Sequence, residues 1–239
     1  MGNKNAQLKH IKDFPPIIGD IMIVGTTATN SSRNRGMYYT SGNNDIWKII
    51  DACIQESNMD NPKPSFNDYI ENEYRKVPLS NNDIEVIKKY LDKGVFLTQT
   101  KEPLSHNLEL LKQKQKKLFS MLEQYNIGFV DTIAECDMSG SSDTDIKNER
   151  KKNKEYLLGL IKDKKVVILN GIGAAVKKFK KACQLNGEPE SVYLEFKQTY
   201  SIKECYGSSG ANRKYDAERL TQWKNAIVPI INETNLYRH

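Results

Sequence analysis

Short apolar segments recur along this chain and alternate with amphipathic helical patterns. Each apolar segment is compact, rich in β-branched or aromatic residues, and typical of a buried strand. Between these segments, apolar residues recur at the three- and four-residue spacing of a helix that packs one face against a core. This alternation predicts an α/β fold, a three-layer α/β/α domain with a central, mostly parallel sheet of about four strands. The expected strands are Ile17–Val24, Ile127–Ile133, Lys165–Leu169 and Ser191–Phe196.

The helices expected between these strands carry an apolar stripe. In Leu108–Tyr125 this stripe is especially clear, because lysines stand between the apolar positions. Asn58–Asn82 is rich in Asn, Pro, Asp and Lys, and is expected to be irregular. A chain of 239 residues fits one large domain, spanning 1–239, better than two. The other expected helices are Ile46–Ile54, Asp83–Leu91, Lys154–Lys162, Ala174–Leu185 and Asp216–Ile231.

Several classes of protein are excluded by the distribution of apolar residues and cysteines. The sequence lacks the run of about 18 apolar residues that a membrane span requires. Met1–Lys12 does not have the apolar core of a secretory signal. We therefore expect a soluble, cytoplasmic monomer. The four cysteines are spaced like neither a zinc site nor an iron–sulfur site, so we expect reduced thiols, no metal and no cofactor.

The basic residues occur in runs along a chain whose formal net charge is +6. Such runs are most often solvated helix faces. If they share one face of the molecule, they also form stripes of positive potential that attract a polyanion. Their clustering favours a nucleic acid as the partner. The runs are Lys112–Lys117, Lys147–Lys154 and Lys177–Lys181.

Two segments combine glycine with small polar side chains in an order that resembles a known family. The first-motif segment, residues 25–49, contains Gly25–Thr29, Gly36–Tyr39 and Asn44–Ile49. The second-motif segment is Gly207–Arg213. Together they resemble the two active-site motifs of the uracil-DNA glycosylase superfamily. The resemblance covers about residues 17–55 and 126–228, and predicts an insertion at about 58–118.

The middle of the chain is similar to one branch of that superfamily. Gly128–Ile133, followed by Gly140–Ile146, resembles the deoxyinosine (hypoxanthine) glycosylase branch, which carries a comparable Gly-Ser-x-Asp-Ser-x-Ile stretch. We therefore place the chain nearest to the deoxyinosine and mismatch-specific DNA glycosylases. The resemblance implies a monofunctional enzyme, since neither motif contains an obvious Schiff-base lysine.

The resemblance also implies roles for individual residues in a site that receives a base rotated out of DNA. Tyr39 is expected to stack on the base. Thr27 stands where better-known branches carry the Asp or Asn that positions the water. Asn44 is expected to orient water or hold the base, although a helix cap is an equally good interpretation. Asp131 is either a substitute carboxylate or a turn-forming residue at the end of a strand.

Contacts with DNA are implied at both motifs and between them. Ser208 and Ser209 are expected to donate to phosphate, and Arg213 to meet the backbone or the orphaned base. Ala211 occupies the usual wedge position but is small, so any wedge must be weak or come from another loop. The residues expected to bind substrate or DNA are Gly25, Thr26, Ser141, Asp143, Asn170, Gly207, Ser208, Ser209, Asn212 and Arg213.

The sequence leaves two possibilities for the substrate. The deoxyinosine branch favours a deaminated base, uracil or hypoxanthine, and a role in base excision repair. Thr27, Ala28, Gly207 and the insertion lie where a pocket could instead be enlarged. That alternative predicts a bulkier hypermodified cytosine in foreign DNA and a role in antiviral defence. A third possibility is a catalytically inactive DNA-binding module of the same fold.

Overall fold

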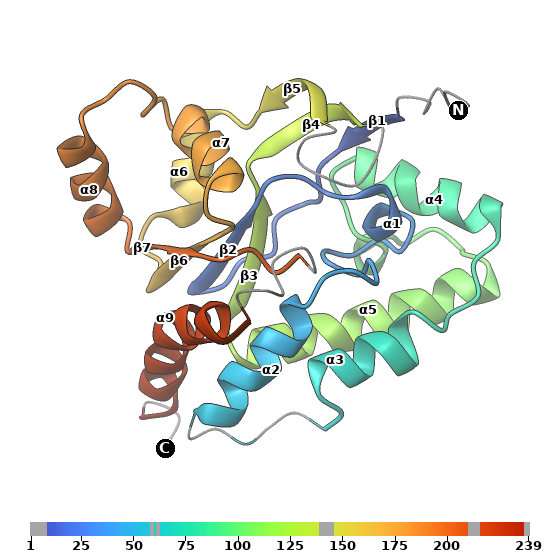
Figure 1. Cartoon of the computed structure of the whole chain (residues 1–239). Coiled ribbons are helices and arrows are strands. Elements are labelled where there is room, and N and C mark those ends of the chain that lie inside the picture. Colours follow the sequence, from blue (N-terminus) through green and yellow to red (C-terminus); the bar gives the residue numbers. More distant parts are fainter. Residues whose placement is uncertain (1–8, 58–59, 61–62, 139–145, 210–215, 237–239) are drawn as a thin grey trace, which may run out of the picture.

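The computed structural model describes residues 9–57, 60, 63–138, 146–209 and 216–236 of the chain (Figure 1). Its central sheet consists of four parallel strands in the order β3-β2-β6-β7. These strands are near-continuous apolar runs because both faces of the sheet are covered. Their bounds are β2 Ile21–Gly25, β3 Ile127–Asp131, β6 Val166–Asn170 and β7 Ile202–Cys205.

Helices cover both faces of this sheet (Figure 1). On one face, Ile23 and Phe129 pack with α2 (Ile46–Glu56), α5 (His106–Gln124) and α9 (Asp216–Leu236). On the other, Val24 and Val130 pack with the second group of helices. Successive strand residues thus enter opposite cores. The three-layer α/β/α architecture with a parallel four-stranded sheet is confirmed. The second group is α6 (Lys154–Ile161), α7 (Ala174–Ala182) and α8 (Glu190–Thr199).

A second, antiparallel sheet was not predicted from the sequence. Its order is β1-β4-β5, with β1 at Lys9–Lys12, β4 at Ile133–Met138 and β5 at Ile146–Lys151. Strand β4 begins almost directly where β3 ends, so the chain passes from one sheet into the other across Thr132. Most of β5 is polar and exposed, and it therefore lacks the apolar pattern of a core strand.

The prediction of a strand at Ser191–Phe196 is wrong, because this segment lies inside α8. Its aromatic and β-branched residues suit either structure locally. The buried and half-buried side chains nevertheless follow a helical spacing, with Tyr193, Phe196 and Tyr200 facing the core, while Leu194 is 50% exposed. The fourth strand is instead the short β7.

The prediction that Asn58–Asn82 is irregular is wrong for its second half. Helix α3 (Phe66–Tyr69) continues into the π-helix η1 (Ile70–Tyr74). The backbone N–H groups of Phe66 and Asn67 donate to the two carboxylate oxygens of Asp51, each at 2.8 Å, and this anchors the start of α3 to α2. The segment 58–118 continues through α4 (Asn81–Asp92) and the 3₁₀ turn η2 (Leu97–Gln99) into α5. None of the described helices is long and apolar enough to cross a bilayer.

Candidate active site

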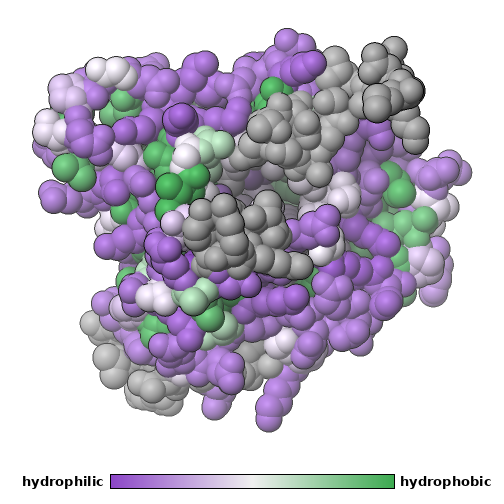
Figure 2. Space-filling view, in the orientation of Figure 1, coloured by the Kyte–Doolittle hydropathy of each residue, from purple (hydrophilic) through white to green (hydrophobic). Residues whose placement is uncertain are grey.

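A cavity of about 800 Å³ lies at the carboxyl ends of the central strands. It is bordered by Gly25, Asp131 and Asn170, the last residues of β2, β3 and β6. Parallel α/β sheets place their sites at this edge, where the loops converge. On the face drawn in Figure 2, hydrophilic side chains predominate and hydrophobic ones form small, separate patches.

Both motif segments contribute to the lining of this cavity. The expected catalytic residues Thr27, Tyr39 and Asn44 all line it. The expected binding residues among the described part of the chain line it as well: Gly25, Thr26, Asn170, Gly207, Ser208 and Ser209. Ser141, Asp143, Asn212 and Arg213, and also Ala211, lie outside the described residues. The tertiary structure therefore brings together residues that are up to about 180 positions apart in the sequence.

Tyr39 adopts a left-handed backbone conformation, with φ of +53°. This conformation is uncommon for a bulky residue and is tolerated where the surroundings hold it. Here the indole Nε1 of Trp47 donates to the Tyr39 carbonyl at 3.0 Å, and the Tyr39 ring packs against Phe129 with centroids 5.4 Å apart. The backbone strain and the packing together set the position of this ring at the cavity wall.

Asp131 and Tyr39 meet above Gly25. A Cβ atom at Gly25 would collide with Oδ1 of Asp131 and with the hydroxyl oxygen of Tyr39, so only glycine leaves room for both. Asp131 is buried and lines the cavity. The pKa of the neighbouring Tyr38 phenol lies well above its usual value. Burial is the main cause, and the nearby Asp131 and Tyr39 raise this pKa further. Asp131 is therefore a buried carboxylate at the cavity wall, and its role as a substitute carboxylate or a turn-forming residue stays a prediction.

The strand ends beneath this carboxylate are tied together by the residue that follows it. The backbone N–H and the hydroxyl of Thr132 both donate to the Gly25 carbonyl, at 3.0 and 2.9 Å. Thr27, further along the first-motif segment, has its hydroxyl 3.8 Å from the Cys136 sulfur. Burial raises the pKa of the Cys136 thiol. Neutral hydrogen bonds therefore join the ends of β2 and β3 next to the buried Asp131.

Asn44 lines the cavity and forms an Asx turn at the start of α2. Its Oδ1 accepts from the backbone N–H of Ile46 at 3.0 Å, in the first turn of α2. Next to it, the Asp45 N–H donates to the Ser208 carbonyl at 2.8 Å, and Asn44 forms a β-bridge with Ser209. The N-cap residue of α2 is Asp45, and the bond from Ile46 leaves the Nδ2 group as the donor that the Asn44 side chain offers to a ligand.

Asn170 and Ser208 are joined at two points. The Asn170 Nδ2 donates to the Ser208 Oγ at 2.9 Å, and its Oδ1 accepts from the Ser208 backbone N–H at 2.8 Å. The side chain of Ser208 is buried, whereas Ser209 is exposed. This geometry favours a positioning role for Asn170 and Ser208, and it makes Ser209 the better placed of the two serines for a phosphate.

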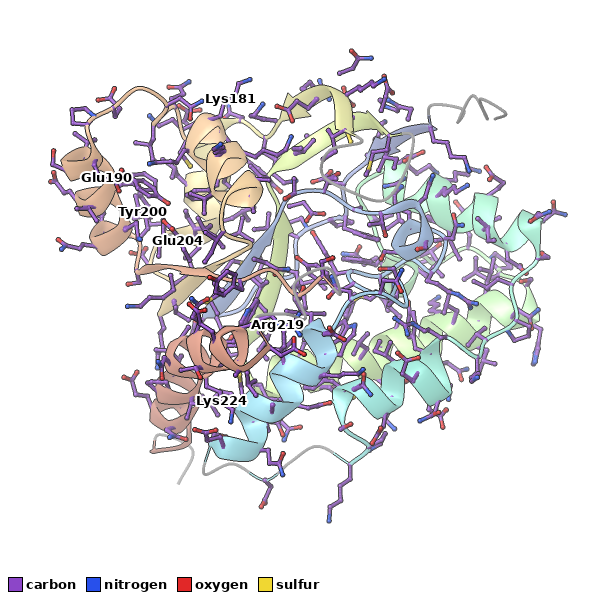
Figure 3. The ribbon with its side chains drawn as sticks, in the orientation of Figure 1. Lys181, Glu190, Tyr200, Glu204, Arg219 and Lys224 are labelled. Atoms are coloured by element: carbon purple, nitrogen blue, oxygen red, sulfur yellow. The ribbon has the colours of Figure 1, made fainter. Side chains whose placement is uncertain are left out.

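Arg219, which sequence reasoning missed, links both motif segments to α9. Its Nη2 lies 3.2 Å from Oδ2 of Asp45, and its Nη1 donates to the Ser209 carbonyl at 3.3 Å. Figure 3 shows Arg219 on α9, close to the start of α2. The available signal was its spacing, since Arg219 precedes the buried Trp223 and Ile227 at four-residue intervals on the inward face of α9.

Residues of the segment 58–118 also contact the first-motif segment. Arg75 donates from Nε to the Thr40 carbonyl at 2.8 Å and from Nη2 to the Ser41 carbonyl at 2.6 Å. Gln115, fully buried on α5, donates to the Gly36 carbonyl at 2.7 Å. These donors from 58–118 satisfy backbone carbonyls of the first-motif segment and so help to fix the path that leads to the Tyr38–Ser41 turn.

The basic runs are partly neutralised by acidic neighbours. Glu149 forms ion pairs with Lys151, Lys178 and Lys181. Burial opposes ionisation of Glu149, but hydrogen bonds and charge from Lys151 and Lys178 outweigh it and lower its pKa to about 2. Across the described ranges, no group of three His, Cys, Asp or Glu side chains is arranged to hold a metal ion.

Comparison with known proteins gives one structural likeness. No family model matches the sequence, and no curated protein matches it. The chain is similar to the solution NMR structure of a "putative Uracil DNA glycosylase" from Methanosarcina acetivorans, with a TM-score of 0.53 and 17% sequence identity. The alignment covers 93% of this chain and 99% of the other. The two proteins therefore share a fold.

Proposed function

We propose that this chain is a DNA glycosylase of the uracil-DNA glycosylase superfamily, which hydrolyses the bond between a base and its deoxyribose. The observation that carries the proposal is the cavity in which Tyr39, Asn44 and Asp131 converge from the motif segments and the strand ends. The fold shared with a protein named as a uracil DNA glycosylase supports it. Duplex or single-stranded DNA is the proposed partner.

The proposed reaction uses each of these three side chains. The base rotates out of the stack and lies against the Tyr39 ring. As the glycosidic bond breaks, its electron pair leaves with the base, and the Nδ2 donor of Asn44 stabilises the charge that develops there. The Asp131 carboxylate stabilises the positive charge on the sugar and accepts a proton from the water whose oxygen bonds to C1′. Thr27, which lies in the first-motif segment with Asn44, helps to place that water.

This hydrolysis needs no covalent intermediate with the protein. A lyase would require an amine that attacks the sugar carbon to form a Schiff base. Within the described lining of the cavity there is no lysine. The proposed product is an intact strand that carries an abasic site.

The deaminated bases uracil and hypoxanthine are the first candidates for the substrate, in base excision repair. A second candidate is a bulkier hypermodified cytosine in foreign DNA, in antiviral defence. One observation favours the second: small residues, Ala28, Ser41, Gly42 and Gly207, line a cavity of about 800 Å³. Pockets of that size hold ligands much larger than a single base.

The test is a base-release assay analysed by mass spectrometry. The protein is incubated with chemically deaminated DNA and, separately, with viral DNA that contains modified cytosines. Release of uracil or hypoxanthine alone would support repair, and release of the modified base alone would support defence. Strand cleavage should require alkali, and borohydride should trap no adduct. Tight DNA binding without any released base would instead support the inactive binding module.

A further inference from the structure

The turn between β6 and α7 presents one apolar side chain at the cavity. Ile172 lines the cavity, yet it is 48% exposed. It stands between Gly171, with φ of +137°, and Gly173, with φ of +92°. These two conformations favour glycine and turn the chain sharply on either side of the isoleucine. An isoleucine at the tip of such a turn has most of one face in water, which is unfavourable in the free protein.

The other exposed large apolar residues of the described chain lie away from this cavity. They are Ile18, Tyr156, Val192 and Leu194. Single exposed apolar residues are ordinary on a protein surface. What distinguishes Ile172 is that its exposed side chain borders the space in which a rotated base would lie.

The turn that carries Ile172 is held firmly from below. The Gly171 N–H donates to the carbonyls of Leu169 and Cys205, at 2.9 and 3.0 Å. The preceding residue, Asn170, is fastened to Ser208 by its two hydrogen bonds. An apolar side chain on a fixed turn loses little conformational entropy when it enters a partner.

We propose that Ile172 is the wedge that enters the base stack of duplex DNA when the target nucleotide rotates into the cavity. This inference rests on the proposed function. Removing a nucleotide from the stack leaves an apolar gap between its neighbours, and proteins that distort DNA fill such gaps with Ile, Leu, Phe or Met. The wedge buries its own exposed surface there, and it slows the return of the nucleotide. A single-stranded substrate has no paired stack to open.

The test compares duplex and single-stranded oligonucleotides of one sequence under single-turnover conditions. Ile172→Ala should lower the rate of base release from the duplex by about tenfold or more, the equivalent of roughly one lost apolar contact in the stack. Release from the single strand should stay within about twofold. Ile172→Leu should restore the duplex rate. Ile18→Ala is the matched control, because Ile18 is 56% exposed and precedes β2 at the opposite end of the sheet.

A second measurement separates this inference from the proposed function. 2-Aminopurine next to the target position reports unstacking by an increase in fluorescence, whether or not the base is released. The wild-type protein should produce this increase on duplex DNA, and Ile172→Ala should lose most of it. If the increase occurs without base release, the glycosylase proposal fails and the wedge stands. Equal rate losses on both substrates, unchanged rates, or equal fluorescence for both proteins would overturn the wedge.

Discussion

Asn170 holds Ser208 by both ends of its amide, and this single pair joins the end of β6 to the segment that follows β7. The amide group matches the serine backbone N–H and hydroxyl at the same time. Both motif segments depend on this pair, since the Ser208 carbonyl in turn accepts from the Asp45 N–H.

Replacing Asn170 with alanine should lower the free energy of unfolding by about 1–3 kcal/mol, because the buried Ser208 N–H would lose its acceptor. Urea unfolding measures the change. Asn225→Ala, on the exposed side of α9, is the control and should stay within about 0.5 kcal/mol of the wild type. An Asn170→Ala protein as stable as this control would show that water or another group replaces the amide.

Asn44 is expected to combine its hydrogen bond to the Ile46 N–H with catalysis, and two variants separate these roles. Asn44→Ala should lower base release strongly and also cost about 1 kcal/mol of stability through the lost hydrogen bond. Asn44→Asp keeps an acceptor for the Ile46 N–H but removes the Nδ2 donor. We expect it to be stable and slow, by about 100-fold or more in the single-turnover rate. Wild-type activity in Asn44→Asp would leave Asn44 with only its structural hydrogen bond to Ile46.

Tyr39 and Asp131 should also be required for activity. Asp131→Asn preserves the shape of the side chain and removes its charge, so we expect base release to fall by about 100-fold to 10,000-fold while folding stays nearly intact. Tyr39→Ala should lower the rate strongly through the lost stacking surface. Asp163→Asn, an exposed aspartate before β6, is the control for charge. Normal turnover by Asp131→Asn would remove the carboxylate from the mechanism.

Arg219 and Lys224 lie on the same helix and should differ in their effect on stability. Arg219 is buried with Asp45, so Arg219→Ala removes the buried cation and leaves the Asp45 carboxylate with the exposed Lys48 at 3.7 Å. It should lower the free energy of unfolding by about 3 kcal/mol. Lys224 pairs with Glu56 at the surface, and Lys224→Ala should cost less than about 1 kcal/mol. Figure 3 shows both residues. Similar unfolding midpoints for the two variants in urea would contradict this assignment.

The lowered pKa of Glu149 predicts that the folding stability of the protein decreases at acid pH. Its pKa lies at about 2 in the folded protein, below the ordinary 4.5, so its ionised form stabilises the fold. That contribution is present above about pH 4.5 and is lost as the pH falls towards 2. Glu149→Gln should flatten the dependence of the urea midpoint on pH in this window. Glu85→Gln, which removes a surface pair with Lys88, should keep the wild-type slope. Parallel curves for wild type and Glu149→Gln would refute the prediction.

The strands β2, β3 and β6 and most of the helices could be predicted from the sequence, because their signal is local. A strand buried on both faces reads as an unbroken apolar run, and a helix such as α5 repeats its apolar residues over many turns. The loops that follow the strands were also predicted to form the site. Their place follows from the parallel sheet itself, which collects the carboxyl ends of its strands at one edge.

The tertiary structure determined those features of the protein that depend on contacts between residues far apart in the sequence. Ser191–Phe196 suits a strand or a helix locally, and its packing against α7 and β7 selected the helix. In the sequence Arg219 resembles any other charged residue, because its partner Asp45 is 174 positions away and lies beside it only in the folded chain. Asp131 and Tyr39 both reach the cavity because Gly25, from another segment, leaves room for their side chains. A local pattern records the preferences of a residue for its neighbours in the chain, whereas these roles arise from contacts that exist only once the chain is folded.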